Sequence, residues 1–176
     1  RGGIHSLYEV GCGSGVNLYL FSKKYPNIVL GGIDYSQPLI DIAKKVVASA
    51  DLKKGEAIQI ICDRKYDVVI SDSVFQYFQT PEYGYQVLEK MYEKAKKTLV
   101  ITEIHDIQMY EEHMNYRKSI VENYEEHYKG LEKTFYDQRV FIEFAEKKKC
   151  KYEIIKPNNE KYWNNKYVFD FYLYKN

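Results

Sequence analysis

Residues 7–15, LYEVGCGSG, place a short apolar run directly before three glycines at alternate positions. Because glycine tolerates positive φ and has no Cβ, such a loop can turn sharply and let a ligand approach the backbone. Residues 16–24 then carry apolar side chains at helical spacing, and the start of a helix offers unpaired N–H groups. A strand, a glycine loop and a helix in this order predict a ligand-binding turn.

A second apolar run over residues 28–33 ends in Asp34, within the stretch VLGGIDYS. A carboxylate at the end of a second strand can accept hydrogen bonds from a vicinal diol such as that of a ribose. The dinucleotide fingerprint G-x-G-x-x-G shares both features, but it requires a glycine where this chain has Val16. A dinucleotide-dependent oxidoreductase therefore stays an alternative, with the glycine spacing against it.

The composition indicates one soluble globular domain. The chain has 176 residues, of which 45% are hydrophobic, and a formal net charge of +1. We expect a single domain over residues 1–176, and the balanced charge gives no reason to expect nucleic acid as a partner. No apolar run is long enough for a membrane span, so we expect a cytoplasmic protein. The three cysteines lie far apart and predict neither a disulfide framework nor a metal site.

Strands and helices alternate through the first hundred residues, which is typical of a parallel sheet with helices on both faces. The pattern predicts further strands at residues 48–54, 66–71 and 98–102 and helices at residues 37–47 and 81–95. Asp137 should cap a later helix, and strands at 151–155 and 166–174 are close enough to pair antiparallel. The predicted fold class is α/β: a Rossmann-like sheet of seven mostly parallel strands with an antiparallel C-terminal pair.

A helical insertion interrupts this rhythm after the fifth strand, at about residues 105–131. Its apolar residues fall at alternating spacings of three and four, which predicts a long amphipathic helix or a pair of helices. The stripe consists of Ile107, Tyr110, Met114, Val121, Tyr124, Tyr128 and Leu131, with Arg117 in one intervening slot. We expect this insertion to act as a lid.

The glycine loop, read as E-V-G-C-G-S-G, resembles motif I of the class I S-adenosylmethionine-dependent methyltransferases. In that family an acid lies two residues before the first glycine. The resemblance implies S-adenosyl-L-methionine as the cofactor. The residues that it places around the cofactor are Glu9, Gly11, Cys12, Gly13 and Gly15.

Further markers of the family follow in order, so that the resemblance covers roughly residues 6–103. Asp34 matches the acid that holds the ribose hydroxyls, and Tyr35 follows it. In the family, the segment that leaves the fourth strand lines the methionine arm of the cofactor and the face of methyl transfer. In this chain that segment begins with Ser71, Asp72 and Ser73.

The remaining marker is a Gly-acid-Ala segment whose acid accepts from the adenine amino group, and two positions compete for it. Asp63 lies only four residues before Asp67, at the start of the fourth strand, which leaves almost no connection. Gly55, followed by Glu56 and Ala57, lies far enough past the second strand for a helix and a short strand. We therefore prefer Glu56 and Ala57 as cofactor-binding residues.

His105 and Asp106 follow the fifth strand, at the carboxyl edge where open α/β sheets place their sites. Methyl transfer is an in-line displacement, and a histidine can remove the proton of a hydroxyl acceptor near neutral pH. We therefore expect these two residues to be catalytic. His113, His127 and Arg117 on the insertion are weaker candidates.

The acceptor follows mostly by elimination. The segment S-D-S-V after the fourth strand is unlike the N/D-P-P-Y/F segment of base-methylating enzymes, and no basic domain is added for nucleic acid. An apolar-walled pocket is predicted from Phe75, Tyr77, Phe78, Phe135, Tyr136 and Trp163. The sequence favours a small-molecule acceptor, and a hydroxyl over an amine. A non-catalytic cofactor-binding module that acts through a partner is a further alternative, and the oligomeric state is left open.

Overall fold

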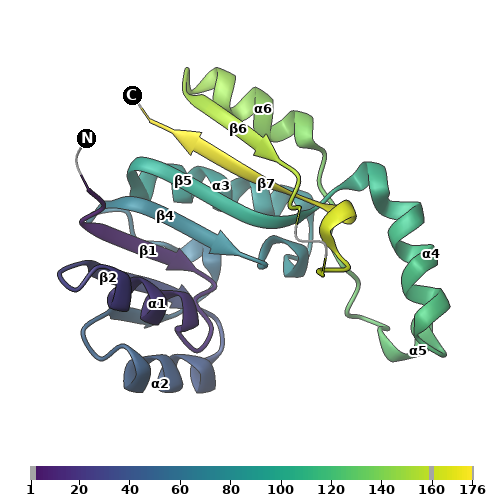
Figure 1. The fold of residues 1–176 in the computed structure, drawn as a ribbon, viewed down its shortest axis with the longest axis horizontal. Helices are drawn as coiled ribbons and strands as arrows, with labels where there is room; N and C mark the ends of the chain where they lie inside the picture. Colours follow the sequence, from purple (N-terminus) through teal and green to yellow (C-terminus); the bar gives the residue numbers. More distant parts are fainter. Residues whose placement is uncertain (1–2, 159–160, 176) are drawn as a thin grey trace.

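Seven strands form one sheet in the order β3-β2-β1-β4-β5-β7-β6 (Figure 1). The computed structural model describes residues 3–158 and 161–175. The strands are β1 (Ser6–Val10), β2 (Val29–Asp34), β3 (Asp51–Lys54), β4 (Tyr66–Asp72), β5 (Ala95–His105), β6 (Lys151–Ile155) and β7 (Val168–Tyr174). The first five strands run parallel, whereas β7 lies antiparallel to both β5 and β6. The predicted seven-stranded fold is confirmed.

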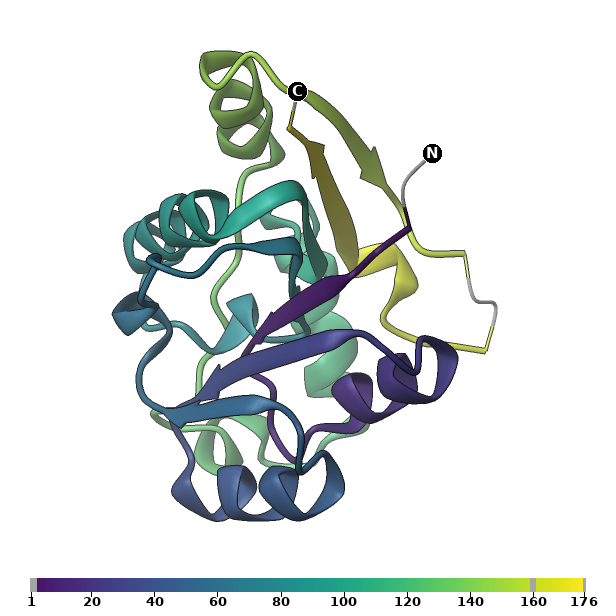
Figure 2. The ribbon, with the colours of Figure 1, turned by 90° about the vertical axis from the view of Figure 1, so that its left-hand side faces the viewer.

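Helices cover both faces of the sheet. They are α1 (Val16–Lys24), α2 (Gln37–Val46), α3 (Pro81–Lys94), α4 (Tyr110–Ile120), α5 (Tyr124–His127) and α6 (Gln138–Lys147). Short 3-10 turns are η1 (Ala57–Gln59), η2 (Phe75–Tyr77), η3 (Ile107–Met109) and η4 (Asn165–Tyr167). Figure 2 shows α3 and α6 on one side of the sheet and α1 on the other. Across the described ranges, no helix combines the length and apolar character needed to cross a bilayer.

The alternation of side chains along β1 divides the core into two clusters. Leu7 packs with Leu18 of α1 and Ile40 of α2, whereas its neighbour Tyr8 packs in the cluster that includes Leu88 of α3. Successive residues of a strand point to opposite faces, so β1 is buried on both. This burial explains why the run before the glycines reads as continuously apolar.

Several element boundaries differ from those predicted. Residues 48–50 form a turn, so β3 begins only at Asp51, and α3 ends at Lys94 because β5 already starts at Ala95. His105 is the last residue of β5 rather than a residue beyond it. The predicted cap of α6 is confirmed, since the Asp137 side chain accepts from the N–H of Arg139.

The insertion consists of η3, α4 and α5, so it contains the predicted pair of helices rather than one long helix, and it stands beyond the carboxyl ends of β1 and β4 (Figure 1). Asn123 adopts a left-handed conformation, with φ of 52°, between the two helices. Asparagine is one of the few non-glycine residues that visit this region readily, so the chain turns there.

The predicted apolar stripe is wrong for three of its members, because Ile107, Tyr110 and Leu131 are exposed. The insertion instead buries His113, whose ring stacks on Tyr167 with centroids 4.6 Å apart. The helix α4 is therefore held by aromatic contact with η4 and not by the predicted stripe of apolar side chains.

We expect Gly84→Ala to destabilise the fold. A Cβ at this position of α3 would lie 2.5 Å from the buried Oη of Tyr136, which donates to the carbonyl of Phe75. Overpacking of this kind costs about 1–3 kcal/mol, whereas alanine in an open helix would stabilise by about 0.5–1 kcal/mol. Urea unfolding measures the change, with the exposed Gln86→Ala of the same helix as the control. A Gly84→Ala variant as stable as the wild type would contradict the packing described.

Candidate active site

The glycine loop is shaped by three positive φ angles. Gly11, Gly13 and Gly15 have φ of 74°, 51° and 84°, a region in which other residues are strained. The N–H groups of Gly11 and Cys12 donate to the carbonyl of Ile33 at 2.8 and 3.1 Å, which fixes the loop to the end of β2. A Cβ at Gly13 would meet no atom within 4 Å. The backbone at Gly13 therefore borders open space that a ligand can occupy.

Asp34 ends β2 directly beside this loop. Its Oδ2 accepts from the N–H of Gly13 at 2.8 Å, and its Oδ1 accepts from the N–H of Ser36 at 2.9 Å. Each carboxylate oxygen has a second lone pair, so both can still accept from a diol. Tyr35, the next residue, is 70% exposed and lies free at the same edge. The structure thus brings together the glycine loop and the acid, as predicted.

The end of β3 reaches the same edge. The N–H of Gly55 donates to the carbonyl of Asp34 at 2.9 Å, and Glu56 and Ala57 follow immediately. Glu56 is exposed and caps η1 in a reciprocal arrangement with Gln59. Glu56 thus lies at the same edge of the sheet as Asp34, and its role as a cofactor-binding residue stays a prediction.

A chain of polar contacts runs beneath the loop. Glu9 is buried, and its Oε1 accepts from Nδ2 of Asn17 at 2.8 Å. The same Nδ2 donates to Oδ2 of Asp72 at 3.0 Å, and Oγ1 of Thr102 donates to Oδ1 of Asp72. Oε2 of Glu9 is buried without a hydrogen-bond partner among the residues described. Burial raises the pKa of Glu9 to about 8. Sequence reasoning missed Asn17, which joins two of the predicted acids.

The side chains of two predicted cofactor-binding residues are buried in contacts within the protein. The Cys12 side chain is buried next to Gly32, and this burial raises the pKa of its thiol to about 12. Oγ of Ser71 donates to the carbonyl of Val10 at 3.1 Å and joins β4 to β1. These side chains form the support under the site.

A pocket of about 320 Å³ lies between the end of the sheet and the insertion. Its lining residues come from the ends of β4 and β5, from η2 and α4, and from the connections before α6 and η4. They are Ser73, Gln76, Tyr77, His105, Arg117, Tyr128, Lys133, Tyr162, Trp163 and Asn164. We call this cavity the acceptor pocket.

The acceptor pocket begins where the polar contacts under the glycine loop end. Ser73, in its wall, directly follows Asp72 and has a φ of 58°, a strained value for serine. Nε2 of Gln76 donates to Oγ of Ser73 at 2.7 Å and holds this turn. Val74 lies against Gly11, so close that a Cβ at Gly11 would collide with it. The pocket and the glycine loop are therefore neighbours in direct contact.

His105 is almost fully buried in the pocket wall. Its ring lies 4.8 Å from that of His113 and 5.0 Å from that of Phe135, measured between centroids. Neither of its nitrogens has a hydrogen-bond partner within the described part of the chain. Burial lowers the pKa of His105 to about 3 and that of His113 to about 4. Both rings are neutral at neutral pH, and His105 is a weak base there.

Asp106 does not join His105 in the pocket wall. Its Oδ1 accepts from the N–H of Gln108 at 3.0 Å and caps η3, and its Oδ2 accepts from Nε2 of Gln138 at 2.6 Å. Both oxygens thus fasten the insertion to α6. The structure gives Asp106 a positioning role and brings only His105 to the pocket. His127 lies exposed on α5.

The predicted aromatic wall is correct in part. Tyr77 and Trp163 line the pocket, whereas Phe75 and Tyr136 are fully buried in the core. Phe135 packs behind His105, and Phe78 packs against the core cluster. The pocket residues that sequence reasoning missed are Tyr128, Lys133, Tyr162 and Asn164. Most of them lie on connections, whose path no periodic pattern predicts.

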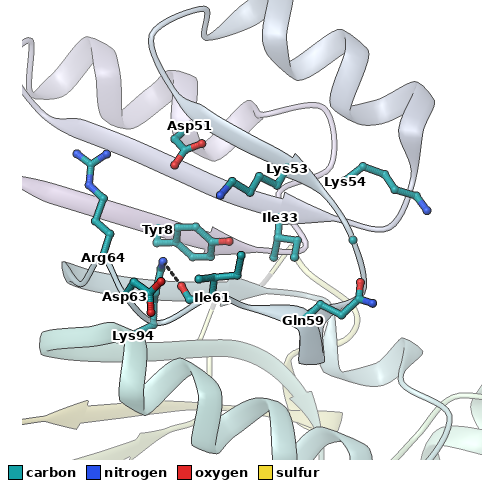
Figure 3. A pocket seen from close by; sticks show the side chains of 11 residues that line it. Tyr8, Ile33, Asp51, Lys53, Lys54, Gln59, Ile61, Asp63, Arg64 and Lys94 are labelled. Atoms are coloured by element: carbon teal, nitrogen blue, oxygen red, sulfur yellow. Dashed lines mark hydrogen bonds between the residues drawn. The ribbon is translucent and has the colours of Figure 1, made fainter.

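A second hollow, of about 270 Å³, lies beside β3 and includes Asp63 (Figure 3). The side chains that line it carry charges of both signs, from the acids Asp51 and Asp63 and the bases Lys53 and Arg64. The buried Lys94 already donates to the carbonyl of Ile61 at 2.6 Å, the contact dashed in Figure 3. This hollow shares no lining residue with the acceptor pocket.

Two curated relatives align with the part of the chain that carries the glycine loop. A malonyl-[acyl-carrier protein] O-methyltransferase of Priestia megaterium is 31% identical over 93 residues, which are 52% of this chain and 33% of that protein. Uncharacterized protein RP028 of Rickettsia prowazekii is 30% identical over 99 residues, 53% of this chain and 38% of that protein. The match thus spans little more than a third of the length of these relatives.

Solved structures share the whole fold. The plantazolicin methyltransferase BpumL, in complex with a triazolic desmethylPZN analog and SAH, has a TM-score of 0.75 at 19% identity, covering 99% of this chain and 78% of that chain. Magnesium protoporphyrin IX methyltransferase (ChlM) from Synechocystis PCC 6803, with bound SAH, has a TM-score of 0.72 at 13% identity, covering 99% of this chain and 75% of that chain. At these identities the likeness shows the fold alone.

The family described as "Methyltransferase domain" matches residues 8–98, more than half of the chain. The matched region begins in β1, includes the glycine loop and Asp34, and ends in β5. The chain therefore belongs to the methyltransferase domain family and has the fold of the class I S-adenosylmethionine-dependent methyltransferases.

Proposed function

We propose that the chain binds S-adenosyl-L-methionine at the glycine loop and transfers its methyl group to a small molecule in the acceptor pocket. One observation carries the proposal: the glycine loop and the acceptor pocket are adjacent. The contacts Glu9–Asn17–Asp72 run from beneath the loop to the end of β4, and the pocket begins at the next residue, Ser73.

The residues present fit this cofactor. Gly13 borders open space, Asp34 retains acceptor capacity for a ribose, and the unpartnered Oε2 of Glu9 suits a cationic group. When bound, the cofactor supplies an electrophilic methyl group. The protein then has to hold the acceptor in line and exclude water, which the insertion over the pocket favours.

We further propose oxygen as the methylated atom. A neutral imidazole keeps one nitrogen lone pair, so His105 can accept the hydrogen bond of an acceptor hydroxyl and orient it. The low pKa of His105 makes orientation of the hydroxyl its contribution. The hydroxyl proton becomes strongly acidic as the oxygen gains the methyl group, and it passes to solvent water. Several curated relatives are named O-methyltransferases, which supports the choice.

Asp34→Asn is expected to weaken the binding of S-adenosylhomocysteine about tenfold or more, because the charged hydrogen bonds to the ribose are lost. Isothermal titration with S-adenosylmethionine, S-adenosylhomocysteine and NAD(P)H measures this. The exposed Asp41→Asn of α2 is the matched control and should bind like the wild type. If NAD(P)H binds and neither S-adenosylmethionine nor S-adenosylhomocysteine does, the proposal is wrong and the oxidoreductase alternative is favoured. Equal affinity in the Asp34→Asn variant would remove the ribose role.

Binding of the cationic cofactor at pH 7 should release a proton from Glu9. With a pKa of about 8, this carboxyl is mostly protonated in the free protein, and a neighbouring positive charge lowers its pKa. Affinity should therefore rise as the pH increases from 6 to 8. Titrations in buffers of different ionisation enthalpy count the protons, and Glu9→Gln should abolish the release. The same proton count in both proteins would show that Glu9 does not respond to the cofactor.

A further inference from the structure

The wall of the acceptor pocket contains two cations without acidic partners. Arg117 reaches it from α4, and Lys133 reaches it from the connection before α6. In the described part of the chain, neither takes part in an ion pair, whereas their neighbour Lys118 pairs with Glu125 at 2.8 Å. Lys166, near the same pocket, pairs with Glu112. Among the described residues, Arg117 and Lys133 thus differ from these two nearby lysines in having no acidic partner.

Aromatic rings hold Arg117 in place without neutralising it. Its guanidinium lies 5.1 Å from the ring centroid of Tyr124 and 4.8 Å from that of Tyr128. Such stacking fixes the plane of the guanidinium and leaves its N–H donors free. Nε of Arg117 is buried with no hydrogen-bond partner among residues 3–158 and 161–175. A buried donor without a partner is costly, which points to a ligand that supplies the acceptor.

Lys133 faces the same space. Its Nζ lies 3.3 Å from the ring centroid of Tyr77, and burial together with the charge of Arg117 lowers its pKa to about 8. It is still mostly protonated at pH 7. The groups that act on it from the neighbouring elements add no negative charge, because His105 and His113 are neutral there.

The acids lie at the other end of the pocket. Tyr162 in the wall is close to Glu103 and Asp72, both of which raise its pKa. Asp72 belongs to the polar contacts under the glycine loop. The acids near the pocket thus lie beside Tyr162 and the glycine loop, whereas the cations of its wall come from α4 and from the connection before α6. This polarity orients a charged acceptor with its anionic group away from the cofactor.

We propose that the acceptor is an organic anion whose carboxylate is bound by Arg117 and Lys133, an inference that rests on the proposed function. A guanidinium binds a carboxylate through two parallel N–H donors, and a lysine adds a compact charge. The rings of Tyr77, Tyr128 and Trp163 offer apolar contact to the remainder of the molecule. The group that is methylated lies toward Ser73, on the side of the glycine loop.

The test compares each acid with its neutral amide. The protein, saturated with S-adenosylhomocysteine, is titrated with 3-phenylpropionate and 3-phenylpropionamide, and with hexanoate and hexanamide. Trp163, the one tryptophan of the sequence, lies in the pocket wall and reports binding by fluorescence. We expect the acids to bind about tenfold or more tightly than the amides. Arg117→Gln and Lys133→Gln should each remove most of this preference, whereas the exposed Lys129→Gln should keep it.

The pH dependence separates the two cations. Wild-type affinity for the acids should fall as the pH rises from 7 to 9, because Lys133 loses its proton around pH 8. Arg117 stays charged, and His105 and His113 stay neutral over this range. Lys133→Arg should abolish the decline and keep the preference for the acids.

Equal binding of acids and amides to the wild type would overturn the inference. A preference that persists in both glutamine variants would overturn it as well. Arg117→Lys keeps the positive charge and should retain part of the preference for the acids. This variant therefore separates the effect of lost charge from that of lost folding. The same titrations record S-adenosylhomocysteine binding, so its absence would count against the proposed function itself. Cofactor binding without any preference for acids would count against this inference alone.

Discussion

The hydrogen bond from the N–H of Gly13 to Asp34 is the contact on which the site depends. It joins the loop after β1 to the end of β2 across 2.8 Å. The carbonyl of Asp34 in turn accepts from Gly55 after β3, so three adjacent parallel strands end at one place. Because the loop glycines have positive φ, this convergence needs no bulky side chain and leaves the backbone open to a ligand.

Electrostatics divide the site into two halves. Glu9 and Asp72 lie together under the glycine loop, linked by Asn17, and burial raises the pKa of Glu9 to about 8. Arg117 and Lys133 stand on the far side of the acceptor pocket, under the insertion. The buried neutral His105 lies between the two halves and adds no charge to either.

The sheet and the cofactor half could be predicted from sequence because their signals are local. β1 and β4 read as continuous apolar runs since helices cover both faces, and the glycine loop and Asp34 are adjacent to strand ends. The residues that anchor the insertion could not be predicted, because His113 is buried by stacking on Tyr167 and a histidine carries no apolar signal. Asp106 had the expected position, but its carboxylate is occupied by the backbone of Gln108 and the side chain of Gln138, contacts that only the tertiary structure creates.

The turn at Asn123 lies within the roof of the acceptor pocket, between Arg117 and Tyr128. Ser73, Gln76 and His105 come from strands and turns of the sheet, whereas Arg117 and Tyr128 come from a segment whose helices are short and joined at this turn. The residues of the roof and those of the glycine loop thus lie in different stretches of the chain, so selection can change the first while the second is preserved.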